Sequence, residues 1–305
     1  MQLLVFFLCV VIFIETLLLL FLLPRKNISR EARLRQKEYA QEQRAERASK
    51  KPAVKTPLQQ RQTEAASKPL PSVPAEEEIA PLFQDRGRIA IVIDDCGYGT
   101  EHLDTLRRIH VPLTLAILPF LDYSKEIAEF AHRHNFEVII HMPMEPKNKE
   151  GLTLEPQTLM TSMSRGAVER IMAEAFDELV YARGINNHMG SKATEDEVFM
   201  GKVFGFLKKK DMFFLDSFVT PKSVCSSLAF KRKIKFARRA IFLDNSSRPE
   251  SIKKQLYALA SRAERLGAAI GIGHDRENTL QILQQEIPVL QEKGYRFVFV
   301  SELAE

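Results

Sequence analysis

Residues 88–99 read RIAIVIDDCGYG, an apolar run that ends in two aspartates and a glycine-containing turn. Such an uninterrupted apolar run is typical of a strand that is buried on both faces of a parallel sheet. Residues 97–110, GYGTEHLDTLRRIH, then predict a turn and a helix. The folded part of the chain therefore begins with a strand, a turn and a helix, and the strand delivers Asp94 and Asp95 at its end.

The same alternation of strand and helix continues to residue 303. Seven or eight such repeats favour either a doubly wound sheet or a (β/α) barrel. About 220 residues with eight strands fit a barrel, and no glycine-rich dinucleotide fingerprint follows the first strand. The sequence therefore predicts an α/β fold, a (β/α) barrel of seven or eight strands, in one domain over residues 86–305. The further strands are expected at 113–119, 136–143, 185–190, 212–217, 237–244, 268–274 and 295–303, and the further helices at 122–135, 164–183, 196–210, 251–267 and 277–294.

Residues 3–23, LLVFFLCVVIFIETLLLLFLL, form a long apolar stretch. At ~1.5 Å per residue, a helix of this length spans the ~30 Å of a bilayer core. Glu15 interrupts the run, but a single acid does not prevent insertion. No small-residue cleavage site follows, so residues 1–24 are predicted to form an uncleaved transmembrane signal-anchor, with a cleaved signal peptide as the alternative.

Residues 25–85 have the composition of a spacer. Residues 29–50 are highly charged with almost no apolar face, and residues 51–85 are rich in Pro, Ala, Gln, Glu and Lys. Neither stretch can bury a core, so we expect a charged stalk followed by a flexible linker. The net charge of the whole chain is only +5. The basic residues after the apolar run therefore indicate a strip beside a membrane rather than a nucleic-acid-binding domain.

The three cysteines of the chain do not make a disulfide framework. Cys9 lies in the apolar run, Cys96 follows Asp95, and Cys225 lies in a predicted loop. We expect all three to be free. A Cys96–Cys225 bridge is the alternative, and it would need an oxidising compartment and a close approach of the two residues.

Polar side chains follow the ends of six predicted strands, where a (β/α) barrel places its active site. Each of them alone would more often be a helix cap or a hydrogen-bonded structural residue. Together they predict a site, because so many buried polar groups at one rim each need a partner. The remaining four histidines, His102, His110, His132 and His134, are expected at the surface. The strand-end residues are Asp94, Asp95, His141, Asn186, Asn187, His188, Asp216, Ser217, Asp244, Asn245, His274 and Asp275.

Carboxylate and imidazole groups together suit a divalent transition metal, for which Zn²⁺ is the first expectation. Three protein ligands and one open position would make a hydrolytic site. Of the adjacent Asp94 and Asp95, one could bind the ion and the other could take a proton from water. Neighbours in a strand point to opposite faces. Both carboxylates reach the mouth only if the backbone turns, and Gly97 and Gly99 would permit that turn.

Six segments, IAIVIDDCGYG, HMPMEP, NNHMGS, FFLDS, FLDN and IGIGH, look like the signatures of one known family and occur in its order. In these segments the chain resembles the NodB-like polysaccharide deacetylases, and most closely their divergent polysaccharide deacetylase branch. The resemblance covers residues 88–303. It implies a distorted barrel, a bound metal ion, and the removal of an acyl group from an amino sugar.

The resemblance also implies roles for particular residues. The family's paired aspartates match Asp94, as the catalytic base, and Asp95, as a metal ligand. Its two-histidine motif, with the histidines four positions apart, matches His141 and then Glu145, so the second histidine is absent here. Its leucine-x-histidine motif, which supplies the general acid, resembles the segment that ends at His274.

The chain departs from the family in two further ways. The arginine-proline-proline segment would fall near residues 187–190, where neither residue type occurs, and the chain has no tryptophan. The third metal ligand is then His188 or Glu145. We favour His188, because imidazole suits zinc and this residue lies at a strand end. Glu145, Asn187 and Asp216 are expected to bind substrate or to orient the ligands.

The predicted function is a metal-dependent hydrolase that removes N-acetyl groups from an amino-sugar glycan, such as a peptidoglycan strand. A glycan-binding module without turnover is the alternative, because family residues are missing, and hydrolysis of another ester or amide is a third possibility. The expected partners are the acetylated glycan and, through residues 3–23, a membrane; no nucleic acid is expected. We expect a single-pass, membrane-anchored protein with its barrel outside the cytoplasm, beside a cell-wall substrate, although the basic residues after the apolar run favour a cytoplasmic side.

Overall fold

The computed structural model describes residues 86–305, which alternate between strands and helices. The strands are β1 (Gly87–Cys96), β2 (Thr114–Ile117), β3 (Glu137–Met144), β4 (Ala182–Met189), β5 (Phe213–Asp216), β6 (Phe236–Arg238), β7 (Ile241–Phe242), β8 (Ala268–His274) and β9 (Tyr295–Phe297). The helices are α2 (Leu103–Arg107), α3 (Ser124–Arg133), α4 (Arg165–Glu178), α5 (Glu197–Lys210), α6 (Cys225–Arg232), α7 (Pro249–Leu266) and α8 (Glu277–Glu292). Two short 3-10 helices are η1 (Ala193–Glu195) and η2 (Val300–Glu302).

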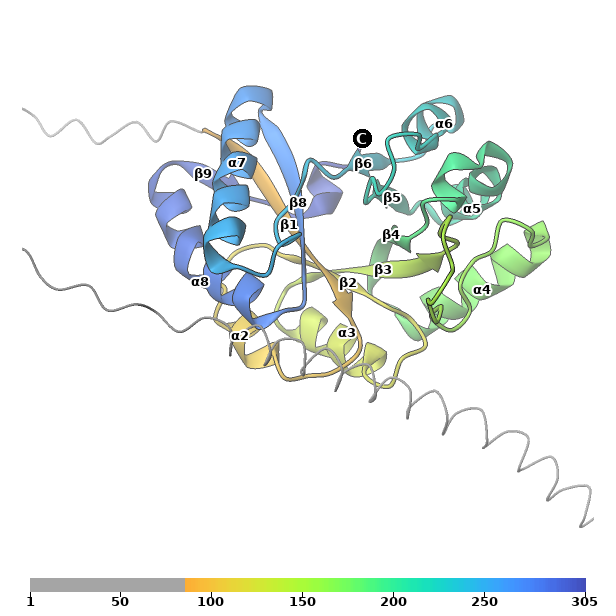
Figure 1. Ribbon diagram of the computed structural model, residues 1–305, viewed down its shortest axis with the longest axis horizontal. Helices are drawn as coiled ribbons and strands as arrows, with labels where there is room; N and C mark the ends of the chain where they lie inside the picture. Colours follow the sequence, from red (N-terminus) through yellow and green to blue (C-terminus); the bar gives the residue numbers. More distant parts are fainter. Residues whose placement is uncertain (1–85) are drawn as a thin grey trace, which may run out of the picture. The chain divides into compact units, whose positions relative to one another are not determined.

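All strands of the described part belong to one sheet, and every strand pair in it is parallel. The strand order is β6-β5-β4-β3-β2-β1-β8-β7, with β9 added beside β1. The sheet curls, and helices lie on its outside (Figure 1). Its two end strands, β6 and β7, are not paired with each other, so residues 86–305 form an open, curled half-barrel rather than a closed barrel.

Side chains that alternate along the strands form two separate hydrophobic cores, one on each face of the sheet. In β1, Ile89, Ile91 and Ile93 belong to the main core that the helices cover. Ala90 and Val92 belong to a second, smaller core on the inner face of the curl. Because side chains in a strand alternate between faces, the residues that continue the inner rows beyond the apolar core reach the open rim of the curl.

Helix α7 packs closely against β8, and its ends follow the usual capping rules. Pro249 occupies the first turn, where a missing N–H costs nothing. Gly267 follows the last turn with a φ of 80°, the left-handed conformation that glycine adopts most readily. Where the helix crosses β8, a Cβ at Gly271 would lie 2.5 Å from Leu259 Cδ2, so a larger residue would force the leucine side chain to move.

The predicted α/β alternation is confirmed, with differences in detail. Residues 182 and 183 were expected to end a helix, but they begin β4. Residues 237–244 were expected to form one strand, but they contribute to two short ones, β6 and β7, because the chain leaves the sheet between them. The last predicted strand ends at Phe297 and continues as a 3-10 helix. Helix α6 lies where a loop around Cys225 was expected. Its apolar residues Leu228 and Ala229 are buried. The helix has only eight residues, however, which are too few to show the helical spacing of apolar residues in the sequence.

The predicted anchor, residues 1–24, and the predicted stalk and linker, residues 25–85, lie outside the described residues. Within residues 86–305 no helix combines the length and the apolar character needed to cross a bilayer. Cys96 and Cys225 are both free and buried, as expected.

Candidate functional site

The candidate site lies at the carboxyl ends of four strands, on the inner face of the curl. Asp94 continues the inner row of β1 beyond Val92, and His141 continues that of β3 beyond Ile139. In β8, His274 follows Ile272 in the same way. The apolar inner core thus ends in a layer of polar side chains, as the alternation of each strand requires.

Asp95 reaches this layer because its backbone adopts the left-handed conformation, which turns the side chain toward the inner face. Its φ is 62°, in the left-handed region, and Gly97 follows with a φ of 132°. Without this turn Asp95 would point to the helix-covered side, opposite to Asp94. The turn expected from the sequence therefore exists. Asp95 and Gly97 make it, whereas Gly99 has no positive φ. Aspartate tolerates the left-handed region better than most residues, which keeps the strain small.

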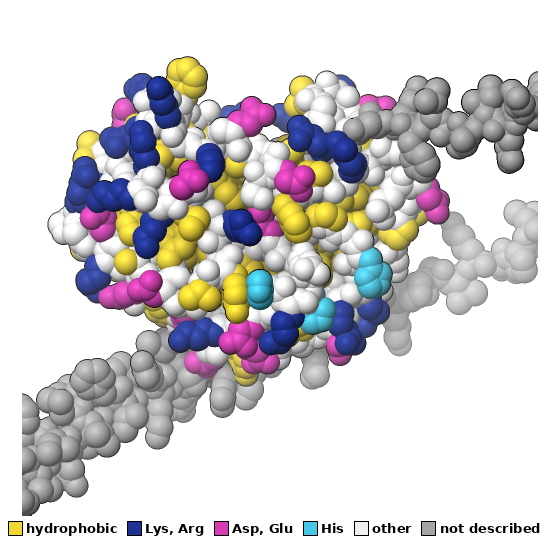
Figure 2. All heavy atoms as spheres, turned by 180° about the vertical axis from the view of Figure 1, so that it is seen from behind, with side chains coloured by type: hydrophobic (Ala, Val, Ile, Leu, Met, Phe, Trp, Pro, Cys, Tyr) yellow, Lys and Arg dark blue, Asp and Glu magenta, His cyan; other side chains and the backbone are white. Residues whose placement is uncertain are grey.

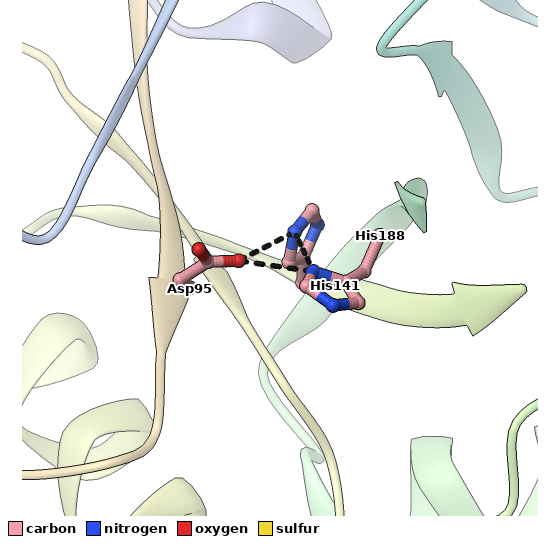
Figure 3. A group of neighbouring side chains, drawn as sticks. All are labelled: Asp95, His141 and His188. Carbon is pink, nitrogen blue, oxygen red and sulfur yellow. Dashed lines mark hydrogen bonds and ion pairs between the residues drawn. The ribbon is translucent and has the colours of Figure 1, made fainter. Parts of the chain in front are cut away.

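Three side chains from three strands meet at one point (Figure 3). Asp95 Oδ1 lies 3.2 Å from His141 Nε2 and 3.0 Å from His188 Nδ1. The two ring nitrogens, His141 Nε2 and His188 Nδ1, are 3.1 Å apart. Zinc–ligand bonds of about 2.0–2.1 Å place tetrahedral ligand atoms about 3.4 Å from one another. One oxygen and two nitrogens at these separations fit the ligand set of a single small cation, and they leave further positions for water or substrate.

Asn186 fixes the orientation of His141. Its side-chain Oδ1 accepts a hydrogen bond from His141 Nδ1 at 2.8 Å, so the other ring nitrogen, Nε2, is the one that faces the cluster. The Nδ2 group of Asn186 donates to Asp94 Oδ1 at 2.8 Å and to Ser217 Oγ at 3.2 Å. One buried amide therefore connects a predicted metal ligand with the predicted base.

The ionisable side chains of the cluster shift one another's pKa values. Burial alone would lower the pKa of His141, but the carboxylates of Asp94 and Asp95 raise it to about 9. Burial alone would raise the pKa of Asp95, yet hydrogen bonds from His141 and His188 hold it well below its usual range. For Asp94, burial dominates and raises the pKa. A protonated imidazole at His141 thus supplies the positive charge that the two carboxylates need, and a bound cation would replace that charge.

His188 carries one more sign of an incomplete site. Its Nε2 atom is buried and has no hydrogen-bond partner among the described residues. A buried polar atom without a partner is costly, and such atoms concentrate where a ligand or water completes the site. It is the other ring nitrogen of His188, Nδ1, that faces Asp95 and His141 and brings this residue into the cluster. Its role as the third metal ligand stays a prediction.

His274 is held by Asp244, which follows β7. Asp244 Oδ1 lies 2.7 Å from His274 Nδ1, and its Oδ2 accepts from the backbone N–H of His274 and from Thr279 Oγ1. Burial alone would lower the pKa of His274, but the hydrogen bond to Asp244 and the negative charges of Asp244, Asp95 and Asp94 together raise it above the ordinary value. His274 pairs in register with Asp94 on the neighbouring strand, so the predicted acid and the predicted base lie side by side at the rim.

Glu145 does not join the three-residue cluster. Its Oε2 accepts hydrogen bonds from the backbone N–H and the hydroxyl of Thr161, at 2.8 and 2.6 Å. Its Oε1 accepts from the ammonium groups of Lys149 and Lys192. Burial would raise the pKa of Glu145, but these partners lower it to about 2. The carboxylate is fully engaged in holding the loop after β3 against the loop after β4.

Asn187 and Asp216 point away from the cluster and support backbone. Asn187 Oδ1 accepts from the backbone N–H of Ser217, and its Nδ2 donates to the carbonyl of Met189. Asp216 accepts from the backbone N–H of Phe218 and from Ser223 Oγ. Both hold the ends of β4 and β5 in place, so neither is free to contact a substrate directly.

Sequence reasoning assigned no role to three polar residues that the structure brings to the rim: Asn186, Ser217 and Asp244. Alternation along the strands was the signal that could have singled out two of them. Asn186 shares the inner face with His188, and Ser217 shares it with Leu215, whereas Asn187 and Asp216 lie on the opposite face. The role of Asp244 depends on the pairing of β7 with β8, which no local pattern reveals.

Arg239 bridges the unpaired edge of the sheet. It lies between β6 and β7, and its guanidinium donates to the carbonyls of Ser217 and Phe218 at 2.6 and 2.9 Å. The same group lies 3.6 Å above the ring centre of Phe242, which in turn stacks on His274. Burial lowers its pKa to about 10, so the group stays charged at neutral pH.

The four histidines expected at the surface divide into two groups. His110 and His132 are exposed, as predicted. His102 is partly buried, and its Nδ1 lies 2.8 Å from Asp275 Oδ1. His134 is also partly buried and stacks on Phe130.

Comparisons with known proteins show which family the chain belongs to. Residues 91–304 match the sequence profile of the family described as divergent polysaccharide deacetylase. The protein YibQ of Escherichia coli (strain K12) is 37% identical over 201 residues, which cover 66% of this chain and 62% of that protein. A protein of Haemophilus influenzae (strain ATCC 51907 / DSM 11121 / KW20 / Rd) is 34% identical over 207 residues, 68% of this chain and 73% of its own length. The match thus spans less than two thirds of the E. coli protein.

The fold also occurs among solved structures. The crystal structure of protein ATU2773 from Agrobacterium tumefaciens C58 superposes with a TM-score of 0.65 at 20% sequence identity, over 72% of this chain and 89% of that one. At this identity the likeness establishes the fold alone. The family profile, in contrast, extends from β1 to the end of the chain and includes every strand that contributes to the cluster. The chain therefore belongs to the divergent polysaccharide deacetylase family.

Proposed function

We propose that the protein is a metal-dependent deacetylase that removes N-acetyl groups from an amino-sugar glycan related to the cell wall. The observation that carries this proposal is the cluster of Asp95, His141 and His188 beside a buried second carboxylate, Asp94. A purely structural cluster has no need for a second carboxylate of raised pKa next to its ligands. A hydrolase needs one as a proton acceptor.

Asp95, His141 and His188 would hold a divalent ion, with zinc preferred because two of the three donors are imidazole nitrogens. When bound, such an ion would polarise the acetamide carbonyl and lower the pKa of a nearby water. Among the residues that would hold the ion, His141 has its ring orientation fixed in advance by a hydrogen bond. Because its Nδ1 donates to Asn186, the proton that a binding ion would displace is the one on Nε2, and the loss of that proton leaves a lone pair facing the cluster.

Asp94 would take the proton from the attacking water. Burial raises the pKa of its carboxyl, so it accepts a proton more readily than an exposed aspartate. Its Oδ1 is held by Asn186, while its Oδ2 faces His141 at 3.6 Å. The carboxylate is thereby oriented before any substrate arrives.

His274 would give a proton to the departing amine. The contact with Asp244 holds its Nδ1 and leaves the opposite ring nitrogen, Nε2, to carry the transferable proton. The raised pKa keeps the imidazole protonated at neutral pH more often than that of a free histidine. Because His274 pairs with Asp94 across β8 and β1, acid and base flank the same rim.

The second candidate function is glycan binding without turnover. The observation that favours it is Glu145, which stands where the resemblance places a second metal-binding histidine. Its carboxylate is neutralised by Lys149 and Lys192 instead. A binding module would retain the rim and the ion, yet release no acetate.

Acetate release distinguishes the two functions. The full-length protein, loaded with zinc, is mixed with N-acetylglucosamine oligomers and with peptidoglycan, and single-turnover acetate release is measured. His274→Gln should keep its zinc and its melting temperature but lose turnover by ~10²–10⁴-fold, the usual scale of general acid catalysis. His110→Gln, at an exposed histidine outside the site, is the control and should leave turnover unchanged.

Zinc content measured on the same samples completes the experiment. His188→Ala should lose both zinc and turnover, because it removes one of three ligands. Equal turnover in folded, zinc-loaded His274→Gln and wild-type protein would remove His274 from the mechanism. A wild-type protein that binds zinc and glycan but releases no acetate from any of these substrates would establish the binding function instead.

A further inference from the structure

A basic surface lies at the amino ends of β5 and β6. The segments just before these strands read LKKKD (207–211) and FKRKIK (230–235), with seven basic residues and one acid. Because β5 and β6 are neighbours in the sheet, with Phe214 paired to Phe236, the two segments lie side by side. We call this region the α5–α6 basic surface. Its members are Lys208, Lys209, Lys210, Lys231, Arg232, Lys233 and Lys235.

Local contacts join the two segments and leave an excess of positive charge. Lys208 Nζ donates to the carbonyl of Arg232 at 2.8 Å. Glu169, Glu197 and Asp211 form ion pairs with Lys209, Lys231 and Lys235, so seven basic residues against three acids leave a net charge of +4. The side chains of two members make no hydrogen bond or ion pair among residues 86–305. These are Lys210 and Lys233.

Two large apolar side chains are exposed within this basic region. Phe230 on α6 is 88% exposed, more than any other large hydrophobic residue in the described part of the chain. Val198 on α5 is 75% exposed and follows Glu197, which pairs with Lys231 beside Phe230. Figure 2 shows Lys and Arg side chains gathered on the half of the surface that α4, α5 and α6 occupy, on the left of that view.

We propose that the α5–α6 basic surface docks onto a bilayer that contains anionic phospholipids, with Phe230 entering the interface between headgroups and acyl chains. The excess of lysines matches an anionic headgroup layer, and an exposed phenylalanine among lysines is the pattern of a peripheral membrane contact. A soluble polyanion would pair with the lysines but would leave Phe230 in water. The sequence also carries the apolar run at residues 3–23, which would keep the domain close to such a bilayer.

The position of this surface leaves the candidate site accessible. In parallel strands the carboxyl ends lie at one edge of the sheet and the amino ends at the other. Asp95, His141 and His188 lie at the carboxyl ends, whereas Lys208–Lys210 and Lys233 precede β5 and β6 at the amino ends. Docking through the α5–α6 basic surface would therefore point the site away from the bilayer, toward polymer outside it.

A tryptophan probe tests the proposal, because the chain has no tryptophan of its own. In full-length Phe230→Trp mixed with vesicles of phosphatidylglycerol and phosphatidylcholine, we expect a blue-shifted emission and quenching by brominated acyl chains. Leu152→Trp is the matched probe in the exposed loop at the opposite edge of the sheet, and its emission should not change. A local readout is required, because binding through residues 3–23 would bring every variant to the vesicle.

The charge dependence is tested by Lys210→Gln combined with Lys233→Asn, since asparagine tolerates the left-handed backbone at residue 233. The equilibrium constant for docking, measured from the emission shift, should fall by roughly 25-fold, about fivefold for each basic residue removed from an anionic surface. The control, Lys125→Gln with Lys254→Gln, removes the same charge from exposed positions on α3 and α7 and should have no effect. An unshifted emission in Phe230→Trp, an equal shift in Leu152→Trp, or equal docking on pure phosphatidylcholine would each overturn the proposal.

Discussion

Glu145 shows how one buried carboxylate can join two loops beside the candidate site. Its side chain engages Thr161, Lys149 and Lys192, and its own carbonyl accepts from the backbone N–H groups of Lys192 and Ala193 at 3.1 Å. The loop that follows His188 is therefore fastened to the end of β3 at two points. An imidazole at this position could not accept from two ammonium groups, so the lysines and the glutamate require each other.

This residue predicts how the stability of the protein depends on pH. The pKa of Glu145 is lowered to about 2 in the folded protein, against an ordinary value of 4.5. Its stabilising contribution is therefore complete above pH 4.5 and is lost as the pH falls toward 2. Glu145→Gln should lower the free energy of unfolding at pH 7 by about 2 kcal/mol, the scale of a hydrogen-bonded charge, and the difference from wild type should shrink below pH 4.5.

Urea denaturation at pH 7, 5 and 3 measures this difference. Glu150→Gln is the control, because Glu150 is exposed on the same loop. A deficit in Glu145→Gln that is the same at all three pH values would show that shape, rather than charge, makes the contribution. Zinc binding by Glu145→Gln should match that of wild type. A loss of zinc would make Glu145 a ligand and contradict the cluster described above.

At the scale of elements, the contact of α7 with β8 depends on glycine. A Cβ at Gly271 would lie 2.5 Å from Leu259 Cδ2, so Gly271→Ala should force Leu259 or the helix to move. We expect a loss of about 1–3 kcal/mol in the free energy of unfolding, the usual cost of overpacking. The control is Gly166→Ala on α4, where no atom lies within 4 Å. There, alanine should be neutral or stabilising, because it favours a helix. Equal unfolding free energies in the two variants would show that β8 and α7 are not closely packed.

The elements that the sequence predicted well are those with long periodic patterns. β1, β3 and β8 are continuously apolar and lie within one or two residues of their expected bounds. The pair β6 and β7 was not separable, because two short strands joined at Arg239 and Ala240 look like one in a local pattern. The residues of the cluster could be named, since each lies near the carboxyl end of a predicted strand. The roles of their partners Asn186 and Asp244 could not, because side-chain contacts between strands depend on register rather than on local sequence.

At the scale of the whole molecule, the question is on which side of a membrane the predicted anchor at residues 3–23 would place the folded domain. A cell-wall glycan as substrate requires the folded domain outside the cytoplasm, whereas the basic residues after position 24 favour the cytoplasmic side. We propose the outer side, because the proposed reaction needs its substrate there. A periplasm-dependent reporter fused after residue 85 should be active, and a cytoplasm-dependent reporter at the same point should be silent. Activity of the second reporter alone would reverse the topology and remove the cell wall as the source of substrate.

The position of β1 in the sheet has a consequence for how the protein is made. β1 is the first strand of the described chain, yet it pairs with β8 over seven positions, from Arg88 with Ala268 to Asp94 with His274. About 180 residues must therefore be synthesised before this pairing can form, and closing so long a loop slows folding. Until then one edge of an apolar strand stays open to other chains. The aspartate pair and the histidine beside it come together only when nearly the whole domain has left the ribosome, so an incomplete chain cannot carry an assembled site.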